Sequence, residues 1–168
     1  RILPQVDRLN VYLNEYSEIP AFLQNPKIRV ATSQEYGNLR DNGKFFFLNS
    51  LEPGYHFTID DDIEYPYDYV FQSILTSKKY EDRAIIGVHG VLLADPLERF
   101  YQGRTVHHFK NLLNIDQFVH LLGTGTVAYH TSLIKINLHN VPVPGMADLW
   151  LALAARKQGI PMICQARN

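Results

Sequence analysis

The stretch that decides the fold is Thr58-Ile59-Asp60-Asp61-Asp62-Ile63-Glu64-Tyr65-Pro66. It continues an apolar run, residues 55–59, whose β-branched and aromatic side chains predict a strand. It ends in a proline, which suits the first turn of a helix. The three carboxylates therefore lie where a strand leaves a sheet. In an open α/β sheet, ligands bind at this edge, beyond the carboxyl ends of the strands.

The three adjacent carboxylates repel one another, so burying them requires a counter-cation. Carboxylate oxygens suit hard divalent ions such as Mg²⁺ or Mn²⁺. Successive side chains of an extended chain point to opposite sides, so we expect Asp60 and Asp62 on one side and Asp61 on the other. The alternative interpretation is that the acidic cluster is solvated or caps the next helix.

The bulk composition indicates one globular domain over residues 1–168, because a chain of this length can bury a real core. The formal net charge is −1 and no basic block stands out, which disfavours non-specific binding to nucleic acid. No apolar run approaches the length of a transmembrane segment. The single cysteine, Cys164, excludes an internal disulfide and a cysteine-based metal site. We therefore expect a reducing, cytoplasmic location.

The order of predicted elements favours an α/β fold. Residues 8–14 and 28–31 read as strands on either side of a short helix at 19–24, which predicts a parallel right-handed crossover. Further strands are predicted at 84–88, 118–122 and 160–164, and helices at 66–79 and 146–157. Residues 91–117 look irregular, apart from a hairpin arm at 101–109.

Two polar segments add candidate site residues. Asp41 and Asn42 are good N-cap types, so a helix beginning there would present backbone N–H groups together with Lys44 to a phosphate or pyrophosphate. The alternative is that Lys44 is a surface lysine; the phenylalanines at 45–47 are interpreted as core. The Gly-Thr-Gly-Thr run at 123–126 permits close backbone approach and supplies hydroxyls, but it lacks the Gly-Lys-Ser/Thr of a phosphate-binding loop.

Individual histidines and one acid remain open to two interpretations each. His89 follows a predicted strand, where it either binds a ligand or hydrogen-bonds a loop. His107 and His108 point to opposite faces of an extended arm, so they make a poor joint metal site. Asp148 lies in the first turn of the helix at 146–157, where it either favours the helix dipole or acts as a general base.

Taken in order, the strand ending in Asp60-Asp61-Asp62, the turn at 123–126 and the acid of Met146-Ala147-Asp148-Leu149-Trp150 resemble inverting glycosyltransferases of the GT-A fold, especially family-2-like bacterial enzymes of surface-glycan assembly. The resemblance covers residues 5–167. It implies a Rossmann-like, mostly parallel central sheet flanked by helices. The family's first strand would lie upstream of Arg1, so we expect an N-terminally truncated domain.

By this resemblance, the chain transfers a sugar from a nucleotide-sugar donor, with a UDP-sugar favoured, to a glycan or lipid-linked acceptor, with inversion. Mn²⁺ or Mg²⁺ would be held by Asp62, with Asp60 near the ribose or orienting the metal, and Asp148 would deprotonate the acceptor hydroxyl. The implied donor-binding residues are Asp41, Lys44, Asp60 and Asp61. The implied acceptor-side residues are Gly123, Thr124, Gly125, Thr126, His89 and His130.

The chain departs from the family where a Glu-Asp pair usually supplies the base, because Ala147 precedes Asp148 here. Two other functions stay open. A nucleotidyltransferase has a similar core, but such enzymes usually begin with a Gly-rich, basic loop that this chain lacks. An inactive GT-A binding or scaffold module fits the missing donor strand, whereas the intact Asp60, Asp62 and Asp148 argue against it.

Overall fold

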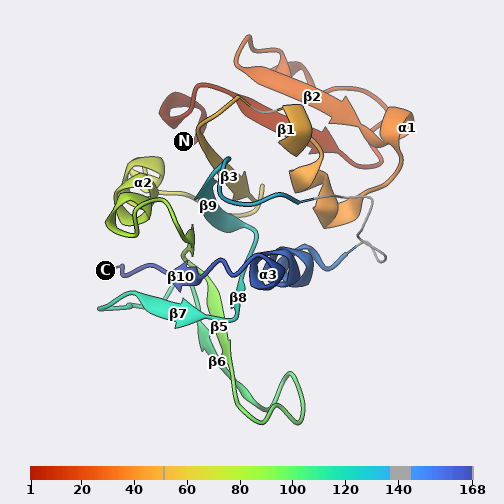
Figure 1. Cartoon of the computed structure of the whole chain (residues 1–168). Helices are drawn as coiled ribbons and strands as arrows, with labels where there is room; N and C mark the ends of the chain where they lie inside the picture. Colours follow the sequence, from red (N-terminus) through yellow and green to blue (C-terminus); the bar gives the residue numbers. More distant parts are fainter. Residues whose placement is uncertain (51, 137–144, 168) are drawn as a thin grey trace.

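The computed structural model describes residues 1–50, 52–136 and 145–167. Over these ranges it is a mixed α/β fold with three sheets and two longer helices (Figure 1). Shorter helical turns are η1 (Leu3–Gln5), η2 (Ala21–Leu23), α1 (Ser33–Tyr36), η3 (Arg40–Phe45) and η4 (Leu48–Ser50). No helix in these ranges is both long and apolar enough to span a lipid bilayer.

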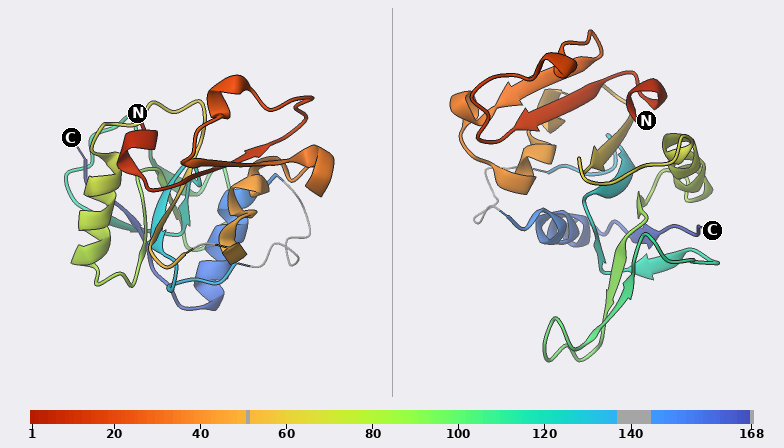
Figure 2. Two further views of the ribbon diagram at one scale, coloured as in Figure 1. Left: turned by 90° about the horizontal axis from the view of Figure 1, so that it is seen from above. Right: turned by 180° about the vertical axis from the view of Figure 1, so that it is seen from behind.

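The N-terminal region forms a separate two-stranded sheet. Strands β1 (Leu9–Leu13) and β2 (Ile28–Thr32) are parallel, with Leu9 opposite Ile28, and η2 lies between them in the chain. This confirms the predicted strand, short helix and parallel strand. The pair lies on one side of the central sheet, opposite the arm described below (Figures 1 and 2).

The central sheet has five strands in the order β3-β9-β4-β10-β7. These are β3 (Tyr55–Ile59), β9 (Thr126–His130), β4 (Ile85–Gly87), β10 (Met162–Cys164) and β7 (Gln117–Val119). Among the described strands of this sheet, only β4 and β10 pair in parallel, so the prediction of a mostly parallel central sheet is wrong. A parallel neighbour needs a long crossover, usually a helix, whereas the chain enters β9 from a short turn at residues 123–125.

Two helices cover the central sheet from opposite faces, α2 (Tyr69–Lys79) and α3 (Ala147–Lys157), as Figure 2 shows. Both fall within the predicted helical ranges. Because side chains alternate along a strand, Ile85 joins the core with Leu151 of α3, while Ile86 faces the side of Tyr80, which follows α2. Gly159, with a φ of +66°, ends α3 as the sequence indicated.

The phenylalanines at 45–47 lie on η3 and just after it. Phe45 is 1% exposed in the main core and Phe47 is also buried, whereas Phe46 is partly buried against Tyr12 and Tyr36. The predicted helix at this point is only a 3₁₀ turn, η3.

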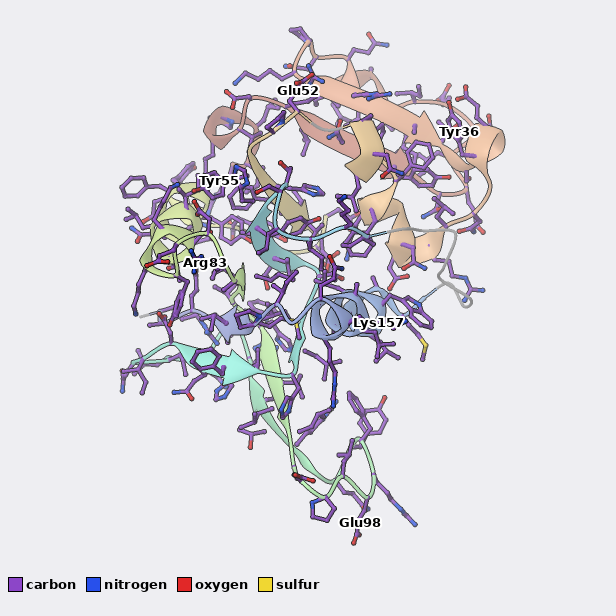
Figure 3. All side chains as sticks on the ribbon, viewed as in Figure 1. Tyr36, Glu52, Tyr55, Arg83, Glu98 and Lys157 are labelled. Atoms are coloured by element: carbon purple, nitrogen blue, oxygen red, sulfur yellow. The ribbon has the colours of Figure 1, made fainter. Side chains whose placement is uncertain are left out.

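A three-stranded antiparallel sheet forms an arm that projects away from β1 and β2 (Figures 1 and 2). It consists of β5 (Gly90–Leu93), β6 (Arg104–His107) and β8 (Leu121–Leu122), and Glu98 lies at its tip (Figure 3). The predicted hairpin arm is therefore present, although the prediction missed β5. The predicted strand at 118–122 divides at His120, because β7 joins the central sheet and β8 joins the arm.

Candidate functional site

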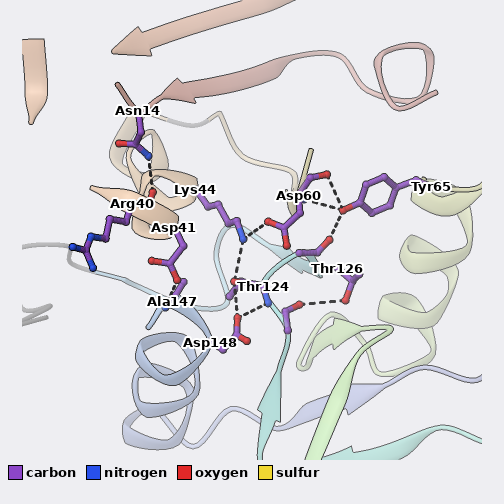
Figure 4. A network of polar contacts seen from close by, with 12 residues as sticks. Asn14, Arg40, Asp41, Lys44, Asp60, Tyr65, Thr124, Thr126, Ala147 and Asp148 are labelled. Atoms are coloured by element: carbon purple, nitrogen blue, oxygen red, sulfur yellow. Dashed lines mark hydrogen bonds and ion pairs between the residues drawn. The ribbon is translucent and has the colours of Figure 1, made fainter. Parts of the chain in front are cut away.

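Four chain segments that are far apart in sequence meet at the end of β3 (Figure 4). They are the residues after β3, the 3₁₀ helix η3, the turn at 123–125 and the first turn of α3. The sequence-predicted residues that they bring together are Asp41, Lys44, Asp60, Thr124, Gly125 and Asp148.

An ion pair between Lys44 Nζ and Asp60 Oδ1 joins η3 to the end of β3. Both side chains are partly buried, at 19% and 34% exposure. Lys44 Nζ also donates to Thr124 Oγ1 over 3.4 Å. The other carboxylate oxygen of Asp60 lies against Gly125, where an added Cβ would overlap it and lie 2.8 Å from the Asp60 Cγ. Glycine is therefore required for the turn to approach Asp60.

Asp148 is exposed, and Thr124 fixes the position of its carboxylate. The backbone N–H and the hydroxyl of Thr124 both donate to Asp148 Oδ1, each over 2.7 Å. Within the part of the chain that the structure describes, Asp148 Oδ2 accepts no hydrogen bond. One oxygen of the carboxylate is thus held by the turn.

Asp41 does not cap a helix of its own. Its Oδ2 accepts the backbone N–H of Ala147 over 2.9 Å, so it binds the N-terminus of α3, 106 residues away in sequence. Its Oδ1 is buried and has no hydrogen-bonding partner in residues 1–50, 52–136 and 145–167. This arrangement fixes η3 against the helix that carries Asp148.

Tyr65 is a site residue that the sequence interpretation missed. It is 5% exposed, and its hydroxyl donates to the Gly125 carbonyl over 2.5 Å while accepting the Asp60 N–H over 2.8 Å. Burial raises the pKa of Tyr65 to about 12, and the nearby Asp60, Asp61 and Asp62 carboxylates act in the same direction, so it stays a neutral phenol. The signal available was a tyrosine placed five residues after the first acid.

Asp61 and Asp62 are exposed and lie in a turn, because β3 ends at Ile59. The alternation of an extended strand therefore does not extend to Asp62. No three His, Cys, Asp or Glu side chains gather as a metal site among the residues placed by the structure. An ion bound mainly by substrate would need fewer carboxylates from the protein, since Mg²⁺ typically takes one or two together with phosphate oxygens.

Thr126 has a structural role at the start of β9. Its hydroxyl is buried, accepts the N–H groups of Val88 (3.3 Å) and His89 (3.2 Å), and donates to the Gly123 carbonyl over 3.2 Å. The turn at 123–125 is thereby attached to the end of β4. An added Cβ on Gly123 would lie 3.2 Å from Cδ2 of the His89 ring, so the imidazole packs on the turn that holds Asp148.

The two predicted acceptor-side histidines differ. Burial lowers the pKa of His89, as do His108, Arg167 and Arg104, against the opposing effect of the Asp148 carboxylate. His89 is therefore a neutral imidazole near Asp148 at physiological pH. His130 lies at the far end of β9 from the turn, where its Nδ1 contacts Ser132 Oγ over 2.7 Å. The structure does not bring His130 to the other site residues.

No protein-family model matches the chain, and a search of curated proteins finds no match. The geometry of the site is therefore the ground on which a function can be assigned.

Proposed function

We propose that this chain is a metal-dependent glycosyltransferase domain that transfers a sugar from a nucleotide-sugar donor to a hydroxyl of a glycan or lipid-linked acceptor, with inversion. The observation that carries the proposal is one polar network. It runs from Asp60 through Lys44 and Thr124 to Asp148, and so connects an acidic strand end with a carboxylate at a helix start (Figure 4).

The donor side of this network is Asp60, Asp62 and Lys44. The two carboxylates would hold Mn²⁺ or Mg²⁺, and a bound divalent ion supplies charge neutralisation to the pyrophosphate leaving group. Lys44 places an ammonium beside Asp60 and within 3.4 Å of Thr124, where it would contact the same phosphates. Tyr65 keeps the residues after β3 fixed against Gly125.

The acceptor side is Asp148. Because Thr124 holds Oδ1 with two 2.7 Å hydrogen bonds, the carboxylate has one orientation and leaves Oδ2 to take the proton of an acceptor hydroxyl. The deprotonated oxygen attacks the anomeric carbon while the bond to the nucleotide phosphate breaks on the opposite face, which inverts the configuration. The family's acidic neighbour of the base is Ala147 here, and Asp41 supplies a second carboxylate at this point by binding the Ala147 N–H.

Titration calorimetry with UDP, GDP and CDP, with and without Mn²⁺, tests the donor side. We expect one nucleotide to bind only with Mn²⁺ and Asp62→Asn to remove that binding. Glu64→Gln is the matched control, because Glu64 is an exposed acid of the same segment that pairs with Arg1. Absence of binding by all three nucleotides would refute the proposal.

Hydrolysis of the matching nucleotide-sugar tests the base. Asp148→Asn should keep nucleotide affinity and lower the rate by about 10²–10⁴-fold, the usual contribution of a general base. A normal rate in Asp148→Asn would rule out this residue as the base.

A further inference from the structure

The three strands of the arm bring two histidines to one end of their sheet, and the first of them, His89, lies near Asp148. Gly90, the first residue of β5, is paired with His107 at the end of β6 and with Leu122 at the end of β8. His89, which precedes β5, therefore lies at the same end of the sheet as His108 and Gly123, which follow β6 and β8. Since Gly123 leads directly into Thr124, this end, which we call the arm base, adjoins the Asp148 carboxylate.

Aromatic contacts hold the arm base together. The rings of His89 and His108 lie 5.2 Å apart, edge to face, and His108 stacks on Phe109 at 4.5 Å. His108 Nδ1 accepts the backbone N–H of Lys110 over 3.2 Å. A neutral imidazole with Nδ1 as acceptor carries its proton on Nε2, so His108 offers an N–H donor.

Two of the three charged groups that act on His89 are positive. They are the guanidinium groups of Arg167 and Arg104, and the third is the Asp148 carboxylate. Arg167 is bound by backbone carbonyls, including those of His108 and Phe109, and these leave its charge uncompensated.

Arg104 begins β6, opposite Leu93 and three residues before His107. It lies over the rings of Phe100 and Tyr101, 4.7 Å from each centroid. In residues 1–50, 52–136 and 145–167, neither Arg104 nor Arg167 forms an ion pair with a carboxylate. Imidazole and guanidinium donors without acidic partners are suited to binding phosphate or carboxylate.

We propose that the arm base is the acceptor subsite, and that it selects a saccharide carrying an anionic group, either phosphate or carboxylate, which binds His89 and His108 with Arg104 as the outer contact. This inference rests on the proposed function, since it places the anion next to the hydroxyl that Asp148 deprotonates. It narrows the acceptor from any glycan hydroxyl to that of an anionic saccharide.

Imidazole NMR spectra at fixed pH test the site directly. The probes are a hexose 1-phosphate, a hexuronic acid, inorganic phosphate and a neutral methyl hexoside. We expect anionic probes to shift the His89 and His108 resonances while His120 and His130 stay unchanged. If only the hexose 1-phosphate and inorganic phosphate shift these resonances, the anionic group of the acceptor is a phosphate. If only the hexuronic acid shifts them, it is a carboxylate. No shift, or an equal shift from the neutral sugar, would overturn the proposal.

Two variants test the ligands. Arg104→Gln should lower the affinity for the anionic probe that shifts the histidine resonances by about tenfold, the effect of one lost charged hydrogen bond. Arg99→Gln, on the same arm, should leave its affinity unchanged. His108→Asn, which keeps an acceptor for the Lys110 N–H, should also weaken it. Unchanged affinity in both Arg104→Gln and His108→Asn would overturn the subsite.

Mn²⁺-dependent UDP binding, measured on the same samples, separates the two proposals. All three variants should bind UDP like the parent chain, because within the described residues Arg99, Arg104 and His108 form no hydrogen bond or ion pair with Asp60, Asp62 or Lys44. If the parent chain binds none of UDP, GDP and CDP with Mn²⁺, the result counts against the transferase. If it binds one of them normally but no anionic probe shifts the histidine resonances, the result counts against the anionic acceptor.

Discussion

Two Lys–Asp pairs of this chain look alike in sequence terms but are built differently. In the first, Lys44 pairs with Asp60, whose side chain is 34% exposed. In the second, Lys79 pairs with Asp116, whose side chain is 8% exposed. The oxygens of Asp116 accept Lys79 Nζ at 2.6 Å, the Tyr80 hydroxyl at 3.0 Å and the Ala166 N–H at 2.6 Å.

The difference separates an acid that holds the fold from one that is open to a ligand. Burial by itself would raise the pKa of Asp116, but the hydrogen bonds from Lys79, Ala166 and Tyr80 outweigh it and hold the pKa below its usual value. Asp116 therefore fastens the end of α2 to the residues after β10. Asp60 has one cationic partner and two acidic neighbours in an exposed turn, so fewer groups of the protein neutralise its charge.

The largest effect is expected from Asp116→Ala. It removes three hydrogen bonds to a charged acceptor, and we expect the free energy of unfolding to fall by about 4 kcal/mol, measured by urea unfolding. Asp60→Asn should change it by less than about 1 kcal/mol and should instead abolish Mn²⁺-dependent UDP binding. If Asp116→Ala and Asp60→Asn destabilise the fold equally, both acids are structural and the two pairs do not differ in role.

The next effect concerns the strand that delivers Asp60. His56 lies on β3 with its Nδ1 2.9 Å from the Tyr129 hydroxyl, and burial lowers its pKa to about 4. The unfolded chain binds a proton near pH 6.5, so stability is complete above that pH and is lost as the pH falls towards 4. The loss is about 3 kcal/mol.

His56→Gln keeps a hydrogen-bonding partner for Tyr129 but does not titrate. Urea unfolding at pH 7.5, 5.5 and 4.5 should show a smaller decline in stability for this variant than for the parent chain. His89, whose pKa is also lowered, acts in the same direction, so the difference between the two chains isolates His56. If both chains lose the same stability between pH 7.5 and 4.5, His56 is not the source of the pH dependence.

A smaller effect on stability is expected from Gly125→Ala. The new methyl group would overlap the Asp60 carboxylate and lie 3.2 Å from Ile63 Cδ1, so Asp60 must leave Lys44. Such overpacking costs roughly 1–2 kcal/mol. We expect Mn²⁺-dependent UDP affinity to fall at least tenfold, as measured by calorimetry. Gly103→Ala in the arm, where the nearest atom is 3.2 Å away, is the matched control and should leave UDP affinity unchanged.

Local patterns in the sequence were sufficient for several elements. The apolar and aromatic residues at 55–59 predicted a strand, and the helical pattern before Gly159 predicted a helix. Both predictions are confirmed. The strand β9 was missed, because the Gly-Thr run at 123–126 was interpreted as a turn and the residues after it were assigned to no strand, although Val127, Ala128 and Tyr129 are at most 1% exposed. Without β9 between β3 and β4, the sheet was assigned the wrong strand directions.

The candidate site divides in the same way. Asp60 and Asp148 were predictable as carboxylates at a strand end and a helix start, which are properties of short segments. The contact of Asp41 with Ala147 spans 106 residues, and the Tyr65 hydroxyl acts on a turn 60 residues further along the chain. Such contacts depend on how distant segments pack, and no periodicity in a short segment specifies them.

The smallest change in stability, and the sharpest test of the comparison, is expected from Lys44→Gln. The pair with Asp60 is partly exposed, and such pairs contribute about 0–1 kcal/mol, so unfolding should hardly change. Ligand binding should change in two directions. Mn²⁺ alone should bind more tightly, because Asp60 loses its competing ammonium, whereas UDP with Mn²⁺ should bind about tenfold more weakly, because a phosphate loses a charged donor.

Lys79→Gln, on the other pair, should alter neither affinity. Opposite changes in Lys44→Gln can arise only if Asp60 faces the metal and Lys44 faces the phosphates. If both affinities fall together, Lys44 serves to position Asp60, and the pair at the end of β3 is structural like that of Asp116.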